Sequence, residues 1–274
     1  MKHLKGKKII ITGAASGIGR ELAFKLAQKN AIVIICDYNN NALMETTDII
    51  KNSGGEVYSK FIDIKNRDKV FNWTQNMANQ FNNIDILINN AGIAGKTSDI
   101  NILTFEEIEN IINTNLWGTI NCTLSLLPLL KKSNDASIVN ISSLAGLTGI
   151  LGALPYSISK FAIRGFTESL RMELMETTIS VIQVHPGVVK TNIIKNIPEF
   201  SLSDSVKSHN AFMKQKGVSA GDAAHTIING IMRGKKRILI GKDALIIDII
   251  SRLFPEMSSK MLYPKMKKII EKLK

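Results

Sequence analysis

The stretch KIIITGAASGIG, residues 8–19, joins an apolar β-branched run to a glycine-rich loop and the start of a helical pattern. Gly13 permits a tight turn, Gly17 lets the backbone approach a diphosphate, and Gly19 lets the following helix pack close to a sheet. The N-terminus of that helix offers free N–H groups and the positive end of its dipole to phosphates. The spacing G-x-x-x-G-x-G differs from the common G-x-G-x-x-G, but its position directly after a first strand favours a dinucleotide-binding loop.

Short apolar runs and helical patterns alternate along the rest of the chain. Thr104 with Glu107, and Ser219 with Asp222, have the spacing of helix caps. Continuous apolar strands separated by helices are typical of a parallel sheet that is covered on both faces and joined by right-handed connections. We therefore expect an α/β fold with a doubly wound, mostly parallel sheet (a Rossmann fold), helices on both faces and a helical C-terminal extension. The expected strands are 8–12, 31–36, 56–62, 85–89, 137–141, 180–185 and 237–240, and the expected helices include 18–30, 41–53, 65–81, 104–131 and 155–177.

The overall composition limits the classes of function. The chain has 274 residues, of which 45% are hydrophobic and 21% charged, with a formal net charge of +12. The lysines are scattered apart from a cluster near the C-terminus, and no zinc-ligand spacing is present, so nucleic-acid binding and a metal site are disfavoured. Cys36 and Cys122 lie in apolar runs, which fits a reducing, cytoplasmic compartment. No run of about 18 apolar residues exists, so we expect no transmembrane segment.

Asp37, at the end of the second expected strand, bears on the choice of cofactor. A carboxylate at this position can accept hydrogen bonds from a ribose 2′-hydroxyl and would repel a 2′-phosphate. No arginine or lysine lies between Gly13 and Gly19, and none directly follows Asp37. These features favour NAD over NADP. The alternative is that Asp37 is only a turn residue that ends the strand.

The stretch ISSLAGLTGILGALPYSISK, residues 141–160, brings together residue types that can perform acid–base chemistry. Tyr156 and Lys160 are four residues apart on one expected helix and therefore share a face. A nearby ammonium favours the phenolate, so we expect Lys160 to lower the pKa of Tyr156 and make it a usable acid and base. Ser143, at a strand end, can donate a hydrogen bond to a carbonyl or a developing alkoxide. A solvated Tyr–Lys pair beside turn serines is the structural alternative.

Taken in order, these motifs resemble the single-domain branch of the short-chain dehydrogenase/reductase (SDR) family. The matching residues are Thr12-Gly13-x-x-x-Gly17-x-Gly19, Asp63, Asn89-Asn90-Ala91-Gly92, Asn115, Ser143, Tyr156-x-x-x-Lys160 and Pro186-Gly187. The spacing to Tyr156 in the family selects Ser143 rather than Ser142 as the catalytic serine.

The resemblance implies a role for each matching residue. The implied catalytic set is Asn115, Ser143, Tyr156 and Lys160; Lys160 would also bind the nicotinamide ribose, and Asn115 would hold a water that connects Lys160 to solvent. Asp63 and Ile64 are expected against the adenine, and Val189 and Thr191 against the nicotinamide carboxamide. The full set expected to bind the cofactor is Gly13, Ser16, Gly17, Ile18, Gly19, Asp37, Asp63, Ile64, Asn90, Ala91, Gly92, Tyr156, Lys160, Pro186, Gly187, Val189 and Thr191.

The implied reaction is reversible hydride transfer between a nicotinamide cofactor, NAD or NADP, and a secondary alcohol or ketone. Apolar residues in the expected substrate loop, 192–216, and in residues 144–154 favour a lipid-like, steroid-like or acyl substrate. Two alternatives stay open. One is a 3-oxoacyl carrier-protein reductase, and the other is a non-catalytic dinucleotide sensor on the same fold.

The C-terminal extension, residues 243–274, has the pattern of two helices punctuated by Pro255 and Pro264. It either packs beside the substrate loop and ends in a solvated tail, or presents its basic second helix to an anionic membrane or an acidic carrier protein. We expect residues 1–274 to form one dinucleotide-binding and catalytic domain. The family resemblance implies a homodimer or homotetramer built on the helices 104–131 and 155–177.

Overall fold

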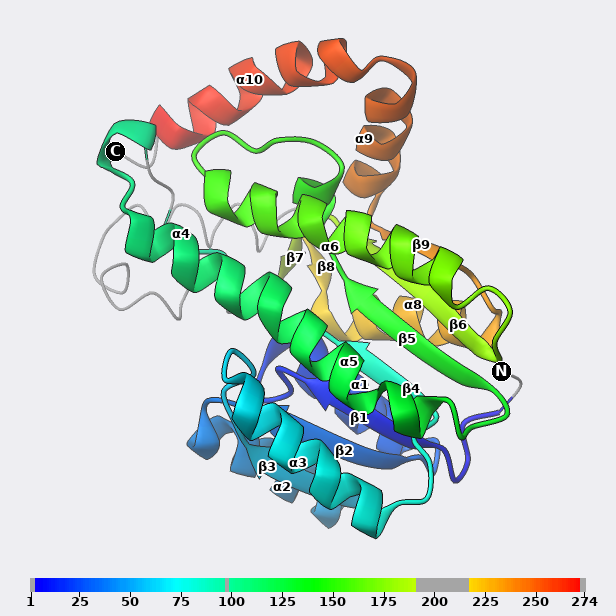
Figure 1. Cartoon of the computed structure of the whole chain (residues 1–274). Helices are drawn as coiled ribbons and strands as arrows, with labels where there is room; N and C mark the ends of the chain where they lie inside the picture. The colour runs from blue at the N-terminus through cyan, green and yellow to red at the C-terminus, as the bar shows by residue number, and fades with distance from the viewer. Residues whose placement is uncertain (1–2, 97–98, 191–216, 272–274) are drawn as a thin grey trace.

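The computed structural model describes residues 3–96, 99–190 and 217–271. In these ranges a sheet of seven parallel strands has the order β3-β2-β1-β4-β5-β6-β9, which confirms the doubly wound architecture (Figure 1). A short parallel ladder, β7 with β8, lies apart from it. The strands are β1 (Lys8–Thr12), β2 (Ile32–Asp37), β3 (Val57–Phe61), β4 (Ile86–Asn89), β5 (Ala136–Ile141), β6 (Ile179–Pro186), β7 (Val189–Lys190), β8 (Val218–Ser219) and β9 (Arg237–Ile240).

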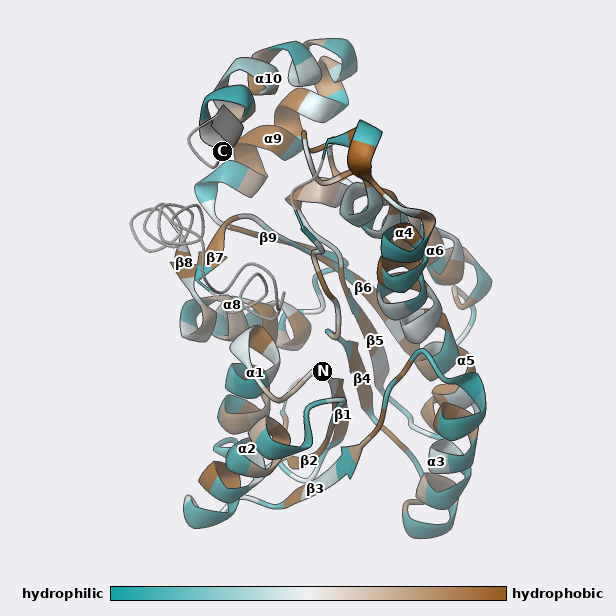
Figure 2. Ribbon diagram, turned by 90° about the vertical axis from the view of Figure 1, so that its left-hand side faces the viewer, coloured by the Kyte–Doolittle hydropathy of each residue, from teal (hydrophilic) through white to brown (hydrophobic). Residues whose placement is uncertain are grey.

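Helices cover both faces of the sheet, as the continuous apolar strands require (Figure 2). Along β1 the side chains alternate: Ile9 and Ile11 pack toward one layer of helices, and Ile10 toward the other. The first layer contains α1 (Gly17–Ala27), α2 (Asn40–Asn52) and α8 (Ala220–Met232), and the second contains α3 (Arg67–Gln80), α5 (Gly118–Leu130) and α6 (Leu154–Glu173).

The order of the strands reverses between β1 and β4, which are neighbours in the sheet. All strands are parallel, so the segments that follow them emerge at the same edge. Open α/β sheets bind their ligands at this edge, beside the point where the order reverses. The glycine loop, Asp37, Asn90 and Ser143 all follow or end strands there.

The predicted helix 104–131 has an interruption that the sequence pattern did not reveal. Thr104 and Glu107 form the predicted capping box at the start of α4 (Phe105–Ile112). A π-helical turn, Asn113–Trp117, then separates α4 from α5. Such a turn inserts an extra residue into the helix and redirects side chains, and it frequently occurs at functional sites. Asn115 lies in this turn.

The C-terminal extension folds as α9 (Lys242–Leu253) and α10 (Pro255–Glu271). Pro255 begins α10 as predicted, but the predicted break at Pro264 is wrong, because Pro264 lies inside α10. Proline removes only one hydrogen bond, and the lysine, methionine and leucine residues around it favour helix. Within the described ranges, no helix is both long and apolar enough to cross a membrane.

Candidate active site

The glycine loop has backbone conformations that only glycine adopts readily. Gly13 and Gly17 have φ values of +67° and +55°. A Cβ added to Gly19 would collide with the carbonyl oxygen of Gly13 and the amide of Asn90. The loop is therefore folded tightly against the start of α1 and against the segment after β4, which leaves the helix N-terminus free to meet a phosphate.

Thr12, the last residue of β1, ties the glycine loop to the segment after β4. Its hydroxyl accepts hydrogen bonds from the backbone N–H groups of Asn90 and Ala91, both at 3.0 Å. The side-chain amide of Asn90 in turn donates to the carbonyls of Thr12 and Gly13, each at 3.0 Å. Two residues predicted to line the cofactor groove, Asn90 and Ala91, are thus held directly beside the glycine loop.

Asp37 ends β2 with its carboxylate against the glycine loop. One oxygen accepts from the N–H of Ala15 at 3.0 Å, and the other accepts from the N–H of Asn39 at 2.9 Å. Burial raises the pKa of Asp37 above its usual value, and these hydrogen bonds oppose the rise. Asp37, which the sequence predicts to bind the ribose, therefore lies where the end of β2 contacts the glycine loop. The sequence did not predict its hydrogen bond with Ala15.

The other residues predicted to contact the cofactor near its adenine end differ in their surroundings. Ser16 precedes α1 without capping it, and Ile18 packs onto the core beneath the loop. The Asp63 side chain is half-exposed and lies 3.5 Å from the ammonium of Lys65. Ile64 is buried against Gly118 of α5. Asp63 is thus open to a ligand, whereas the Ile64 side chain packs under a helix.

Lys160 and Tyr156 lie together on α6, at the carboxyl edge of β5. The ammonium nitrogen of Lys160 is 5.6 Å from the centre of the Tyr156 ring. It donates a 3.0 Å hydrogen bond to the carbonyl of Ile141, the last residue of β5. The side chain is buried, and burial lowers the pKa of Lys160 to about 8.

The pKa of Tyr156 differs in direction from the sequence expectation. Burial raises it above its usual value, and a hydrogen bond with the Ser143 hydroxyl opposes that rise. The expectation that Lys160 lowers it was wrong for the protein alone. The reason is that burial disfavours the charged phenolate more strongly than the hydrogen bond with Ser143 favours it. Tyr156 is therefore a neutral phenol at neutral pH.

Asn115, in the π-helical turn, is fully buried, and its side chain makes three hydrogen bonds. Its amide oxygen accepts from the N–H of Ile93 at 2.8 Å, and its amide nitrogen donates to the Ile93 carbonyl and the Ser159 hydroxyl, both at 2.9 Å. A Cβ on Gly92 would lie 3.1 Å from the Asn115 oxygen and 3.3 Å from the Lys160 nitrogen. Asn115, Gly92 and Lys160 therefore share one small space, and the water-holding role of Asn115 stays a prediction.

Ser143 leaves β5 in an extended conformation and begins the short 3₁₀ helix η3 (Leu144–Gly146). Its hydroxyl accepts from the N–H of Ala145 at 3.1 Å, so its proton is free to be donated elsewhere. Ser142 is buried, and its hydroxyl donates to the carbonyl of Lys160 at 2.9 Å. The Ser143 hydroxyl interacts with Tyr156, and its selection as the catalytic serine stays a prediction.

The segment after β6 is held by the C-terminal extension. Pro186 ends β6, and a Cβ on Gly187 would collide with the carboxylate of Asp243, at the start of α9. The same carboxylate accepts from the N–H of Val188 at 2.7 Å. Val189 is buried in β7. The predictions for Thr191 and for the loop 192–216 lie outside the described residues.

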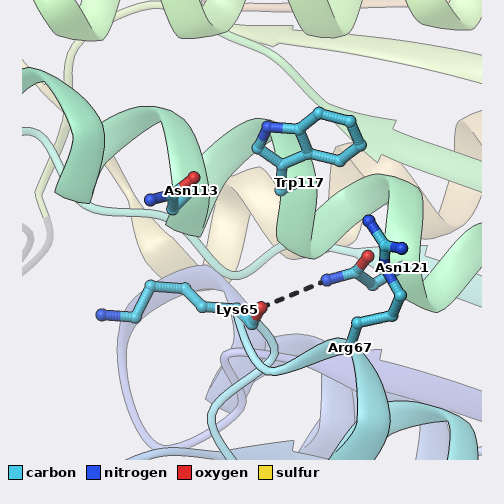
Figure 3. A pocket seen from close by; sticks show the side chains of 5 residues that line it. All are labelled: Lys65, Arg67, Asn113, Trp117 and Asn121. Carbon is cyan, nitrogen blue, oxygen red and sulfur yellow. Dashed lines mark hydrogen bonds between the residues drawn. The ribbon is translucent and has the colours of Figure 1, made fainter.

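A hollow lies between the start of α3 and the π-helical turn, away from Ser143, Tyr156 and Lys160. Figure 3 shows the side chains of Lys65, Arg67, Asn113, Trp117 and Asn121 around it. Asn121 donates to the main-chain oxygens of Ile64 and Lys65. None of the predicted catalytic residues lines it, so it does not belong to the acid–base site.

Some residues of the site were missed by sequence reasoning. Ala15, Asp243 and His185 each make a hydrogen bond to a predicted site residue or its neighbour. His185 directly precedes the Pro186 motif, which was an available signal. Asp243 acts from the C-terminal extension, and no local pattern links it to Val188.

Known proteins are similar to this chain in sequence and in fold. The family model for short chain dehydrogenases matches residues 7–201. The putative oxidoreductase SadH of Mycobacterium tuberculosis is 35% identical over 256 residues, 92% of each chain. The NADP-dependent 3-hydroxy acid dehydrogenase of Schizosaccharomyces pombe is 30% identical over 87% of this chain and 92% of its own. A short chain dehydrogenase/reductase from Burkholderia phymatum, solved in complex with NAD, has a TM-score of 0.84 at 24% identity, covering 94% of this chain and 96% of that one.

These matches define the class of the protein. The chain belongs to the short-chain dehydrogenase/reductase family, and it is an oxidoreductase of that family. The likeness to the Burkholderia structure shows that the two chains share a fold.

Proposed function

We propose that the protein is an NAD-dependent oxidoreductase that interconverts secondary alcohols and ketones of apolar substrates. One observation carries the proposal. Tyr156, Lys160 and Ser143 meet at the same sheet edge as a glycine loop whose backbone only glycine can adopt readily. An acid–base group beside a dinucleotide loop is the arrangement that alcohol oxidation or ketone reduction requires.

The residues at this edge fit a nicotinamide dinucleotide. The glycine loop and the start of α1 would hold the diphosphate, Asp37 the adenosine ribose, and Lys160 the nicotinamide ribose. When bound, the nicotinamide supplies the acceptor or donor of a hydride. All other steps depend on side chains of this chain.

The proton is handled by Tyr156. Because burial keeps its phenol neutral, Tyr156 can donate a proton to a carbonyl oxygen, or accept one back from the alcohol in the reverse direction. The Ser143 hydroxyl orients and stabilises that oxygen. The Lys160 ammonium stabilises the phenolate that remains after donation, because opposite charges in a buried site attract strongly.

Two contacts of the glycine loop support NAD over NADP. Asp37 already places a carboxylate beside Ala15, where a 2′-phosphate would add like charge. Arg20, in α1, donates to the carbonyl of Ala15 and forms an ion pair with Glu45 at 3.1 Å, so its guanidinium is already engaged.

The surroundings of the site support an apolar substrate. Leu151 and Leu154, shortly before Tyr156, are partly exposed, and α9 packs beside η3, which follows Ser143. Apolar side chains on α9, on α10 and at the residue between them are also exposed, namely Leu245, Ile246, Ile249, Leu253, Phe254, Met257, Met261 and Tyr263. We infer that α9 forms one wall of the substrate site. The 3-oxoacyl carrier-protein reductase stays the second candidate, favoured by the net charge of +12.

The experiment that tests the proposed function is the Tyr156→Phe substitution. It removes the hydroxyl that handles the proton and keeps the ring. In a screen of secondary alcohols and ketones with NAD⁺ or NADH, we expect the turnover of the best substrate to fall on the order of 10³-fold. The dissociation constant of NADH, measured by nicotinamide fluorescence, should change little.

Tyr58→Phe is the matched control, because Tyr58 lies on β3 with its hydroxyl on Glu56, remote from the catalytic cluster. It should leave turnover unchanged. Turnover of Tyr156→Phe within a few-fold of the wild type would overturn the assignment of Tyr156, and a wild type that binds neither nucleotide would overturn the proposed function.

A further inference from the structure

The imidazole of His185 is fully buried at the end of β6, directly before Pro186. Its Nδ1 lies 2.9 Å from the main-chain carbonyl oxygen of Ser143. A carbonyl can only accept a hydrogen bond, so Nδ1 carries the proton and donates it. A buried side chain that the proposed chemistry does not use is thus bonded to the backbone of the predicted catalytic serine.

The position of this contact follows from the end of the sheet ladder. The N–H of Ser142 donates to the carbonyl of Val184 at 2.8 Å, and the next bond of a parallel ladder would come from the N–H of residue 186. Residue 186 is proline, which has no N–H. Pro186 therefore cannot donate the ladder bond to the carbonyl of Ser142, and the imidazole of His185 instead donates to the next carbonyl, that of Ser143, just beyond the end of β5.

The other side of the imidazole faces the C-terminal extension through β9. Arg237 and His185 lie on the same face of adjacent strands, because Gln183 pairs with Arg237 and His185 with Leu239. Arg237 forms an ion pair with the buried Asp248 of α9. Among the described residues, the Nε2 of His185 and the Nε of Arg237 are buried without a hydrogen-bond partner. Nδ1, bonded to the Ser143 carbonyl, is therefore the ring nitrogen that anchors His185.

The ring also stays in one protonation state. Burial, with the charges of Arg237 and Arg164, lowers the pKa of His185 to about 4, while Asp248 and the Ser143 carbonyl oppose this. His185 is therefore neutral near pH 7, and its single N–H is committed to Ser143.

We propose that His185 is a positioning residue, which fixes the backbone of Ser143 so that the serine hydroxyl points at the reacting oxygen. The inference rests on the proposed function, because it needs Ser143 to contact the substrate. His185 itself contacts neither substrate nor cofactor in this account. It acts through the Ser143 carbonyl.

Two substitutions of His185 separate the hydrogen bond from the bulk of the ring. His185→Phe keeps a ring of similar size without a donor, whereas His185→Asn keeps an N–H close to the Nδ1 position. We expect His185→Phe to lower kcat by roughly 10- to 100-fold, less than the loss of an oxyanion donor itself. The KM and the dissociation constant of NADH should stay within about threefold, and His185→Asn should recover most of kcat.

A double-mutant cycle with Ser143→Ala tests whether the effect passes through the serine. Once the serine hydroxyl is absent, its position no longer matters, so His185→Phe should cause no further loss in the Ser143→Ala background. Additive losses in kcat would overturn the proposal, because they would show that His185 affects turnover independently of Ser143.

The outcomes distinguish a failure of the proposed role of Ser143 from a failure of the positioning role of His185. If Ser143→Ala keeps full turnover, the proposed role of Ser143 is wrong. If Ser143→Ala loses turnover but His185→Phe does not, the proposed function stands and the positioning role is wrong. Should His185→Phe not fold, ¹⁵N NMR of the wild type decides: a proton on Nδ1 supports the proposal, and a proton on Nε2 overturns it.

Discussion

The two halves of the sheet, β3-β2-β1 and β4-β5-β6-β9, present different kinds of groups at the same edge: mainly backbone groups in the first half and side chains in the second. After β1 and β2, the groups that meet the expected cofactor are backbone N–H groups shaped by glycines, with the single carboxylate of Asp37. After β4 and β5 and along α6, the groups are side chains: Asn115, Ser143, Tyr156 and Lys160, buried or half-buried and hydrogen-bonded to the protein or to each other.

This difference shows how each half acquires its chemistry. The first half depends on the backbone of twelve consecutive residues, 8–19, which contacts Asp37 and Asn90 and has no room for a Cβ at Gly19. The second half depends on contacts between distant segments, such as Asn115 with Ile93 and Lys160 with Ile141. Binding and turnover should therefore respond separately to substitutions in the two halves.

The largest effect is expected from the Gly19→Ala substitution in the glycine loop of the first half. Gly19→Ala places a methyl group against the Gly13 carbonyl and the Asn90 amide, both of which are fixed by the fold. We expect the free energy of unfolding to fall by ~3 kcal/mol, as in overpacked cores. The affinity for NADH should fall on the order of 100-fold, because the loop can no longer close on the helix N-terminus. Urea denaturation and fluorescence titration measure the two quantities.

Gly165→Ala is the matched control, since Gly165 is also a helical glycine but has open space where a Cβ would be. Alanine favours helix over glycine, so the variant should gain up to ~1 kcal/mol of stability and leave the affinity for NADH unchanged. If Gly19→Ala behaved like Gly165→Ala, the tight packing of the glycine loop would be refuted.

Lys160→Met tests the second half and should change the free energy of unfolding by a smaller amount. The pKa of Lys160 is about 8 in the folded protein and 10.5 for the free side chain, so below pH 8 the buried ammonium costs ~3 kcal/mol of stability. Methionine removes that cost but leaves the Ile141 carbonyl without its donor, which costs ~1–3 kcal/mol. We expect a net gain of ~1 kcal/mol at pH 7, together with a large loss of turnover.

The stability difference between the wild type and Lys160→Met should change with pH in one direction. Between about pH 8 and 10.5 the unfolded chain binds more protons at Lys160 than the folded protein, so wild-type stability rises with pH relative to Lys160→Met. The advantage of the variant should therefore shrink over this window. Urea denaturation at pH 7 and pH 10 measures it, with Lys51→Met on the exposed side of α2 as control. A variant clearly less stable at pH 7 would contradict the account.

Much of the fold was predictable because each signal was local. The β-branched runs are buried on both faces and became β1, β2, β4, β5 and β6, and the capping pairs at Thr104 and Ser219 begin helices as expected. The pair Tyr156–Lys160 lies within α6, so its proximity follows from helix geometry, and the glycine spacing lies within one short segment that joins β1 to α1.

The remaining features depend on what surrounds a residue in the folded chain. The direction of the Tyr156 pKa is set by burial, which spacing along a helix does not report. The π-helical turn at Asn115 and the continuity of α10 through Pro264 do not follow from an apolar period. Asp243 and His185 reach the site across 55 and 42 residues of sequence, respectively, so only the fold reveals them.

The most direct test of the central claim, that the first half of the edge binds NAD and selects it, is a parallel fluorescence titration with NADH and NADPH. The wild type, Asp37→Ala and the exposed control Asp48→Ala are compared. We predict that the wild type binds NADH at least ~10-fold more tightly than NADPH, because a 2′-phosphate beside a carboxylate costs several kcal/mol. Asp37→Ala should lower the ratio of the NADPH dissociation constant to the NADH dissociation constant, and Asp48→Ala should leave this ratio unchanged. Tighter binding of NADPH by the wild type, or an unchanged ratio in Asp37→Ala, would contradict the account.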